Sequence, residues 1–316
     1  MESITLREGG HHRLSSRLGA ALCWTASIFA AAVCLFIIGY LMVQGWHAVN
    51  WAFLTTDPDP SILENSAGGI RTPMAGTAIL VLGSILLALP LALGAAIYLA
   101  EYMEERRWIT RIVRIGLETL ASVPSVVFGM FGLAVFTMGM FSFLSGNGAS
   151  GSHSAFGRSF IVASIVMAVH ILPFVIKVAE ESIRNIPASL RQGAYALGMT
   201  KWRTIRKVVL PAARPGIATA VVLGMGLAAG DTAIVWLTLG GSMTMAMDKW
   251  WQASNWLPAL RGAGSTLTTY AYFNSPAGDG NSPGAAFGAA FVLICIVLAF
   301  NLLAVLVFRR RDAAGR

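Results

Sequence analysis

Six long apolar runs dominate the sequence and restrict what the chain can fold into. They cover Leu18–Val43, Gly76–Tyr98, Ile115–Phe136, Ser159–Ile176, Pro215–Leu239 and Gly284–Phe308. A bilayer core about 30 Å thick needs about 20 apolar residues per helix, and each run meets or approaches that length. Hydrophobic residues make up 56% of the chain and charged residues only 12%, as in polytopic membrane proteins. The sequence therefore predicts an all-α membrane protein with six transmembrane helices.

The distribution of Lys and Arg predicts how these helices are oriented. Basic residues gather before the first run, between the second and third, between the fourth and fifth, and after the last. Only Arg71, Arg158, Lys249 and Arg261 fall on the other side. Since basic loops stay in the cytoplasm, we expect a multi-pass membrane protein with both termini cytoplasmic. This asymmetry explains the net charge of +8 and argues against nucleic-acid binding.

One strongly basic, amphipathic stretch, residues 180–215, separates the fourth and fifth runs and is called the basic segment below. Pro187 suits the first turn of a short helix that Gly198 ends. Leu190, Ala194 and Leu197 then fall on one face of that helix.

A second short helix is predicted to follow this glycine. Thr200 suits its cap, Trp202, Ile205 and Val209 form an apolar stripe, and Pro211 is expected to stop it. Two helices joined at a glycine bend on the cytoplasmic side have the form of a docking element for another protein. A basic interfacial loop without a partner is the alternative.

Three ionisable residues lie inside the predicted spans and are candidate pathway residues, because such groups cost several kcal/mol in hydrocarbon unless they find a partner. Glu118 follows Arg114 by four residues, so a local ion pair would explain it. Asp231 lies deep in the fifth run and serves either the pathway or, protonated, helix packing. His170 donates to an anion or bonds a neighbouring carbonyl.

Small and polar residues recur along the third run, at Glu118, Ser122, Ser125, Gly129 and Gly132. Their spacing puts them on one stripe of a continuous helix. Such a stripe either lines a pathway or lets a second helix approach closely.

The basic segment resembles the EAA loop of ATP-binding-cassette (ABC) importer permeases, and most closely the A-type permease family of phosphate-specific importers. The matching residues there are Glu180, Glu181, Arg184, Pro187, Leu190, Arg191, Ala194, Ala196, Leu197, Gly198, Trp202, Val208, Leu210 and Pro211. Further matches in the spans, such as Val123, Pro124, Ser125, Gly230 and Thr232, extend the resemblance from about Gly69 to Arg311.

The resemblance implies the type I ABC importer (MetI-like) permease fold over residues 69–308. Residues 1–17 would form a cytoplasmic lead, 18–68 an additional first span with its external loop, and 309–316 a basic cytoplasmic tail. The residues implied in ATPase docking are Arg184, Leu190, Arg191, Gln192, Ala194, Leu197, Gly198 and Trp202. The pathway candidates are Glu118, Ser122, Ser125, His170, Lys177, Asp231 and Thr232.

The partners implied by the resemblance are a second, C-type permease, two copies of an ATPase and an extracytoplasmic phosphate-binding protein. The chain contains no Gly-x-x-x-x-Gly-Lys-Ser/Thr loop, so ATP and Mg²⁺ are expected at the ATPase and no cofactor at this chain. We expect neither catalytic residues nor a metal site. Cys23, Cys34 and Cys295 lie in apolar runs, and no disulfide is expected.

The sequence departs from the family at several positions, among them Lys177 in place of the usual Arg and Asp231 in place of the usual Glu. Gln192 and Gly193 replace the acid and the first alanine of the loop motif, and Leu227 stands where the family usually has Arg. No Lys or Arg then remains inside any run, so another oxyanion or a phosphorylated solute is an alternative cargo. A membrane-embedded enzyme or sensor is a further alternative, but only Glu118, His170 and Asp231, on three different runs, are available to it.

Overall fold

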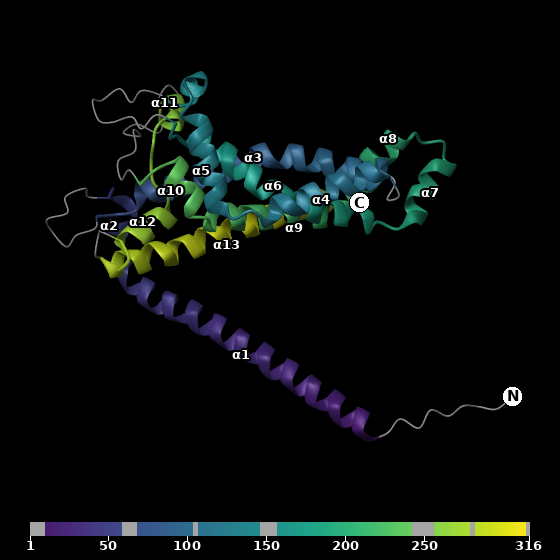
Figure 1. Ribbon diagram of the computed structural model, residues 1–316, viewed down its shortest axis with the longest axis horizontal. Coiled ribbons are helices and arrows are strands. Elements are labelled where there is room, and N and C mark those ends of the chain that lie inside the picture. Colours follow the sequence, from purple (N-terminus) through teal and green to yellow (C-terminus); the bar gives the residue numbers. More distant parts are fainter. Residues whose placement is uncertain are drawn as a thin grey trace.

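The structure is a computed structural model that describes residues 10–58, 68–103, 107–145, 157–241, 256–278 and 282–313 (Figure 1). The ordered elements, all helical, are α1 Gly10–Ala48, α2 Trp51–Thr55, α3 Arg71–Ile97, η1 Tyr98–Tyr102, α4 Trp108–Ser122, α5 Ser125–Phe136, η2 Gly139–Leu144, α6 Phe160–Arg184, α7 Ala188–Ala196, α8 Lys201–Thr204, η3 Ile205–Val209, α9 Leu210–Gly230, α10 Ala233–Thr238, α11 Trp256–Arg261, α12 Leu267–Asn274 and α13 Pro283–Ala313. The start of the predicted lead and the end of the predicted tail lie outside the described residues.

The helices confirm the predicted all-α membrane class. Within the described residues, five helices are long and apolar enough to cross a bilayer, and α4 with α5 makes a sixth span if the bent pair is taken together. The remaining elements are short and lie at the two ends of the bundle. Figure 1 shows α7 and α8 at one end, called the α7–α8 end, and α2, α10, α11 and α12 at the other, called the α12 end.

The third predicted span is not one continuous helix. α4 and α5 meet at an angle of 95°. The reason lies in Pro124, which has no N–H to donate and which disfavours a helical conformation in the residue before it. Val123 is accordingly extended (φ −71°, ψ 128°), as is Pro124 itself (ψ 141°). The bend also breaks the predicted stripe, since Glu118 and Ser122 lie on α4 and the other three residues on α5.

The fifth predicted span begins earlier and ends earlier than the sequence indicated. Pro211 does not stop a helix, because Lys201–Gly230 form one uninterrupted helix through α8, η3 and α9. Pro211 falls in the first turn of α9, where a missing N–H is tolerated, and the wide π turn η3 comes directly before it. The helix ends at Gly230 because Asp231 is extended (φ −76°, ψ 123°), and α10 follows this break.

The core of the bundle consists of α3, α6 and α9, which run side by side along its length (Figure 1). Small residues let these helices approach each other closely. A Cβ atom on Gly83 would lie 2.6 Å from the Ser164 hydroxyl oxygen, and one on Gly224 would lie 2.9 Å from Ile85 and Val175. Packing of this kind replaces the hydrophobic effect as the force that holds apolar helices together in a lipid environment.

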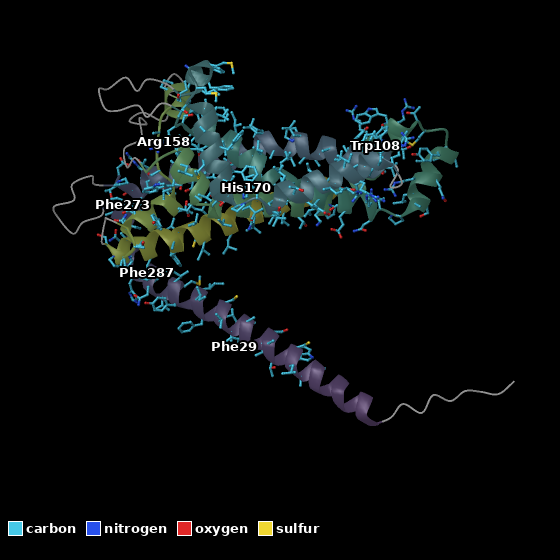
Figure 2. All side chains as sticks on the ribbon, in the orientation of Figure 1. Phe29, Trp108, Arg158, His170, Phe273 and Phe287 are labelled. Atoms are coloured by element: carbon cyan, nitrogen blue, oxygen red, sulfur yellow. The ribbon has the colours of Figure 1, made fainter. Side chains whose placement is uncertain are left out.

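The α12 end is tied together by hydrogen bonds between elements far apart in the sequence. The Leu267 N–H at the start of α12 donates to the Thr77 hydroxyl of α3 over 2.9 Å. The carbonyls at the end of α10 are held by the segment before α6, through Arg158 Nε to Leu237 O at 3.2 Å and Ser159 N–H to Thr238 O at 3.1 Å. Figure 2 shows Arg158 at this end of the molecule.

Helix α1 diverges from the bundle and meets it only near the α12 end (Figure 1). Its last turns pack on α13, where the Tyr40 ring lies 5.7 Å from that of Phe287 and the Trp46 ring lies 6.0 Å from that of Phe291. Gly45 permits this approach, because a Cβ atom there would lie 2.5 Å from the Cβ of Phe291. Large apolar side chains such as Phe29, labelled in Figure 2, are exposed along the rest of α1.

Candidate functional site

The basic segment forms the two short helices and the glycine bend that the sequence predicted. Helix α7 starts one residue after Pro187, which is its N-cap rather than part of its first turn. Gly198 follows α7 with a left-handed backbone (φ +74°). Its N–H donates to Tyr195 O at 2.9 Å, and the next N–H, of Met199, donates to Ala194 O at 3.1 Å. This pair of bonds is a Schellman cap, which glycine favours because it has no Cβ atom.

The two short helices of the basic segment lie at the tip of the molecule (Figure 1), where several large apolar side chains are exposed. Leu197 is 84% exposed, Trp202 57% and Leu190 47%, while Gln192 and Gly198 are exposed beside them. The basic residues Arg203, Arg206 and Lys207 are also exposed. Large apolar side chains and basic residues exposed together on short helices that project beyond the long ones are typical of a surface that another protein covers.

The other side of the basic segment holds it to the bundle. Ala194 is buried, and the Arg191 side chain turns inward. Its guanidinium donates to Glu101 Oε1 at 3.0 Å, to Ile183 O at 2.8 Å and to Ile186 O at 2.5 Å. Arg191 and Ala194 therefore face the bundle whereas Leu197 is exposed, although the resemblance implied all eight residues in ATPase docking.

Glu180, on α6 at the start of the basic segment, connects the end of α6 to α4. Its buried carboxylate accepts from Arg114 of α4 at 2.5 Å and pairs with Arg184 Nε, one turn along α6, at 2.9 Å. Arg114 thus pairs with Glu180, and the local Arg114–Glu118 pair predicted from sequence is replaced by this longer-range one. Sequence reasoning missed the role of Glu180, although its i,i+4 spacing to Arg184 was a usable signal.

The polar pathway candidates near the middle of the bundle gather where α5, α6 and α10 meet. His170 lies midway along the bundle (Figure 2), between Phe128 of α5 and Phe174, with ring centroids 5.1 Å and 6.1 Å away. Its Nδ1 is buried and makes no hydrogen bond to the described residues. Asp231 lies at the break between α9 and α10, and α10 packs on α5 and α6, so both candidates belong to the same packed group of helices.

Asp231 has a definite structural role at this break. Its Oδ1 accepts the Ile234 N–H of α10 at 2.8 Å, while its own N–H donates to Leu227 O at 3.2 Å. The carboxylate thus caps the first turn of α10, and Thr232 next to it is half-buried without a capping bond. Leu227, one turn earlier, is half-buried against the main apolar core.

The other pathway candidates do not join this group. Glu118 and Ser122 are exposed on α4, Lys177 is exposed farther along α6, and Ser125 is half-buried at the start of α5. The glycines of the predicted stripe serve helix packing, since a Cβ atom on Gly129 would lie 2.8 Å from Leu237 of α10. Among the residues described, no group of three or more His, Cys, Asp or Glu is placed to hold a metal ion.

Comparison with known proteins identifies the class of protein that this bundle and its projecting helices form. Residues 88–313 match the family described as "Binding-protein-dependent transport system inner membrane component". The chain belongs to this family and is a permease subunit of an ABC importer.

Several permeases of named systems are similar to this chain along most of its length. It is 29% identical over 307 residues to the "Phosphate transport system permease protein PstA 1" of Mycobacterium tuberculosis, covering 96% of this chain and 90% of that one. It is 27% identical over 297 residues to the "Probable ABC transporter permease protein YqgI" of Bacillus subtilis, covering 93% and 95%. It is 30% identical over 247 residues to the PstC phosphate permease of Haemophilus influenzae, covering 70% and 77%.

Solved structures show the same fold at lower sequence identity. A bacterial ABC transporter that imports the polysaccharide alginate aligns with a TM-score of 0.57 at 17% identity, covering 94% of this chain and 99% of that one. The inward-facing MetNI methionine ABC transporter aligns with a TM-score of 0.52 at 18% identity, covering 77% and 94%. These structures support the predicted MetI-like permease fold.

Proposed function

We propose that this permease subunit imports inorganic phosphate and docks its ATPase through the exposed side of the basic segment. The observation that carries the docking proposal is the two-sided construction of α7 and α8. Leu197 and Trp202 are exposed at the tip, while Arg191 of α7 holds the inward side to η1 and to the end of α6. A surface that is exposed on one side and attached to the bundle on the other is suited to pass a movement of a partner protein on to the bundle.

The remaining assembly follows from this proposal. The α7–α8 end faces the cytoplasm, as the distribution of basic residues indicates, and both termini lie on that side. A second, C-type permease completes the pathway, two ATPase copies bind ATP and Mg²⁺, and an extracytoplasmic binding protein delivers phosphate. This chain itself binds no cofactor. Similarity to the PstA 1 and PstC permeases supports phosphate as the cargo.

The docking proposal is tested by disrupting the exposed side of the basic segment. Leu197→Asp places a charge at the centre of the proposed interface, and Gly198→Pro cannot adopt the positive φ of the bend. Both variants should insert normally but lose transport-coupled ATPase activity in proteoliposomes that contain the whole complex. Ser189→Ala, on an exposed residue at the start of α7, is the matched control. Unchanged ATPase coupling in both variants would refute the docking role.

A second cargo is favoured by one specific residue. Leu227 occupies the position where phosphate permeases usually carry Arg, and it packs against the apolar core instead. Another oxyanion or a phosphorylated solute would need a different arrangement of positive charge. Competition of phosphate, phosphite and molybdate for uptake separates these cargoes: phosphate should compete best if the proposal holds. Leu227→Arg should then strengthen the binding of phosphate during uptake if this position faces the pathway.

A further inference from the structure

Three basic residues of the basic segment contact one short element, the π turn η1 at the end of α3. Arg184, the last residue of α6, donates to the Leu99 carbonyl at 3.2 Å. Arg191 of α7 pairs with the Glu101 carboxylate at 3.0 Å. Lys201, the first residue of α8, lies with its Nζ 4.4 Å from the centre of the Tyr102 ring. These three contacts are called the η1 clamp.

The η1 clamp is stiff at its centre. The Glu101 side chain is only 6% exposed and that of Arg191 only 19%, so their charge-assisted hydrogen bond is shielded from water. Tyr102 stacks on Tyr98 within the same turn, with ring centroids 6.3 Å apart, which fixes the ring that Lys201 meets. Wide turns of this kind are frequent at functional positions of helices.

Helix α3, which leads into η1, reaches the opposite end of the molecule. Helix α3 continues directly into η1 and, at about 1.5 Å per residue, spans roughly 40 Å. At its other end Thr77 accepts the Leu267 N–H of α12, and Gly76 lies against the Ser265 carbonyl. Figure 1 shows α3 running from the α7–α8 end to the α12 end. One continuous helix therefore contacts both the basic segment and the far end of the bundle.

We propose that η1 receives the movement of the basic segment and passes it through α3 to the α12 end, with Glu101 and Tyr102 as positioning residues. This inference rests on the proposed docking of an ATPase to α7 and α8. Because α8 continues through η3 into α9 as one helix, a movement of α8 also moves α9. The η1 clamp adds a second, non-covalent route, so that α3 and α9 move together.

The test is a double-mutant cycle in the whole complex, reconstituted with the second permease, the ATPase and the binding protein. Glu101→Gln and Arg191→Gln each remove one charge of the clamp, while Gln at position 191 still has donors for the Ile183 and Ile186 carbonyls. Each single variant should lower the stimulation of ATPase activity by the external binding protein about tenfold. The double variant should lose no more than the worse single variant, because both act through one contact. The amount of ATPase that copurifies should stay unchanged.

Tyr102 offers a matched pair of variants. Tyr102→Phe keeps the aromatic ring below Lys201, whereas Tyr102→Leu removes it. Leucine should lower the stimulation by about two- to fivefold, the range expected for an exposed cation–π contact, and phenylalanine should not. The thermal unfolding midpoint of each purified variant shows whether the subunit has stayed folded.

The outcomes separate this inference from the docking proposal. Full stimulation in the single variants, or losses that multiply in the double variant while the ATPase stays bound, would overturn the role of η1 alone. Failure of the unmodified protein to bind an ATPase would overturn both. A single-variant loss of stimulation with normal ATPase binding and no further loss in the double variant supports the role of η1.

Discussion

Asp231 shows how one side chain in a membrane helix combines a structural and a functional expectation. A carboxylate in the middle of a span predicts a pathway role or a protonated, hydrogen-bonded group. In the structure it caps α10, a helix that packs on α6, which carries His170. The two roles make different demands, because a cap needs only an acceptor oxygen, whereas an electrostatic role needs the charge.

We predict that Asp231→Asn leaves stability almost unchanged, because the amide oxygen still accepts the Ile234 N–H. Asp231→Ala removes the acceptor and should lower the free energy of unfolding by about 0.5–2 kcal/mol. Thermal unfolding in detergent measures both effects. Phosphate uptake by the Asn variant then decides whether the charge matters: normal uptake would leave Asp231 with the capping role alone.

Asp57, at the α12 end, carries a pH-dependent contribution to stability. Burial alone would raise the pKa of its carboxyl, but hydrogen bonds from Arg71 and Thr72 outweigh this and hold the pKa below its usual value of 3.8. Thr72 donates its hydroxyl to Oδ1 at 2.7 Å, and Arg71 donates to both oxygens. Because the folded pKa is depressed, this contribution is present at neutral pH and is lost as the pH falls through the folded pKa.

We predict that Asp57→Asn unfolds at a lower temperature than the parent at pH 7. The difference should stay constant down to about pH 4 and narrow below it, as the parent carboxyl becomes protonated. Unfolding midpoints measured across this pH range check the prediction. A gap that widens in acid would contradict it.

At the scale of single elements, the basic segment contains two glycines that differ in backbone conformation, one helical and one left-handed. Gly193 lies within helix α7, and a Cβ atom there would have open space around it. Gly198 also has open space around it, but its φ is +74°. The space available is equal at the two sites, so any difference between them reports backbone conformation.

We predict that Gly193→Ala stabilises α7 by about 0.5–1 kcal/mol, because alanine loses less backbone freedom in a helix. Gly198→Ala should destabilise the bend by about 1–2 kcal/mol, since a left-handed backbone is unfavourable for alanine. Amide hydrogen exchange in α7 measures both: protection should rise in the first variant and fall in the second. Equal protection in the two variants would argue against the left-handed bend.

The sequence predicted the elements well and their interruptions poorly. The apolar runs and the Gly198 bend could be predicted because each depends on local composition or on a single backbone conformation. The 95° bend at Pro124 could not, because prolines also occur inside helices that stay continuous here, as at Pro90 and Pro173. The η1 clamp was also missed, since Glu101 and Arg191 are far apart in the sequence and meet only in the folded bundle.

At the scale of the whole molecule, the bundle and α1 are joined through a small contact that depends on glycine. A Cβ atom on Gly45 of α1 would lie 2.5 Å from the Cβ of Phe291, and one on Gly288 of α13 would lie 3.2 Å from the Cβ of Ala48 of α1, so both glycines permit the close approach. Gly39, two turns earlier on α1, has open space around it. The angle between α1 and the bundle therefore depends on this one contact between α1 and α13, called the crossing below.

We predict that Gly45→Leu displaces α1 from α13, because overpacking such a contact costs about 1–3 kcal/mol. Gly39→Leu should leave the contact intact. The measurement is crosslinking between Tyr40→Cys and Phe287→Cys, whose parent rings lie 5.7 Å apart, in a background without Cys23, Cys34 and Cys295. Equal crosslinking yields in the two glycine variants would show that the crossing tolerates a side chain.

The same crossing also matters for the synthesis of the protein and its insertion into the membrane. Helix α1 leaves the ribosome before the bundle helices, but Phe287 and Phe291, which it packs against, are translated about 240 residues later. At about 5–20 residues per second, α1 would wait for roughly 12–50 seconds before this docking site exists. During biogenesis, the insertion machinery, lipid or an already finished neighbour must therefore shelter a solitary apolar helix.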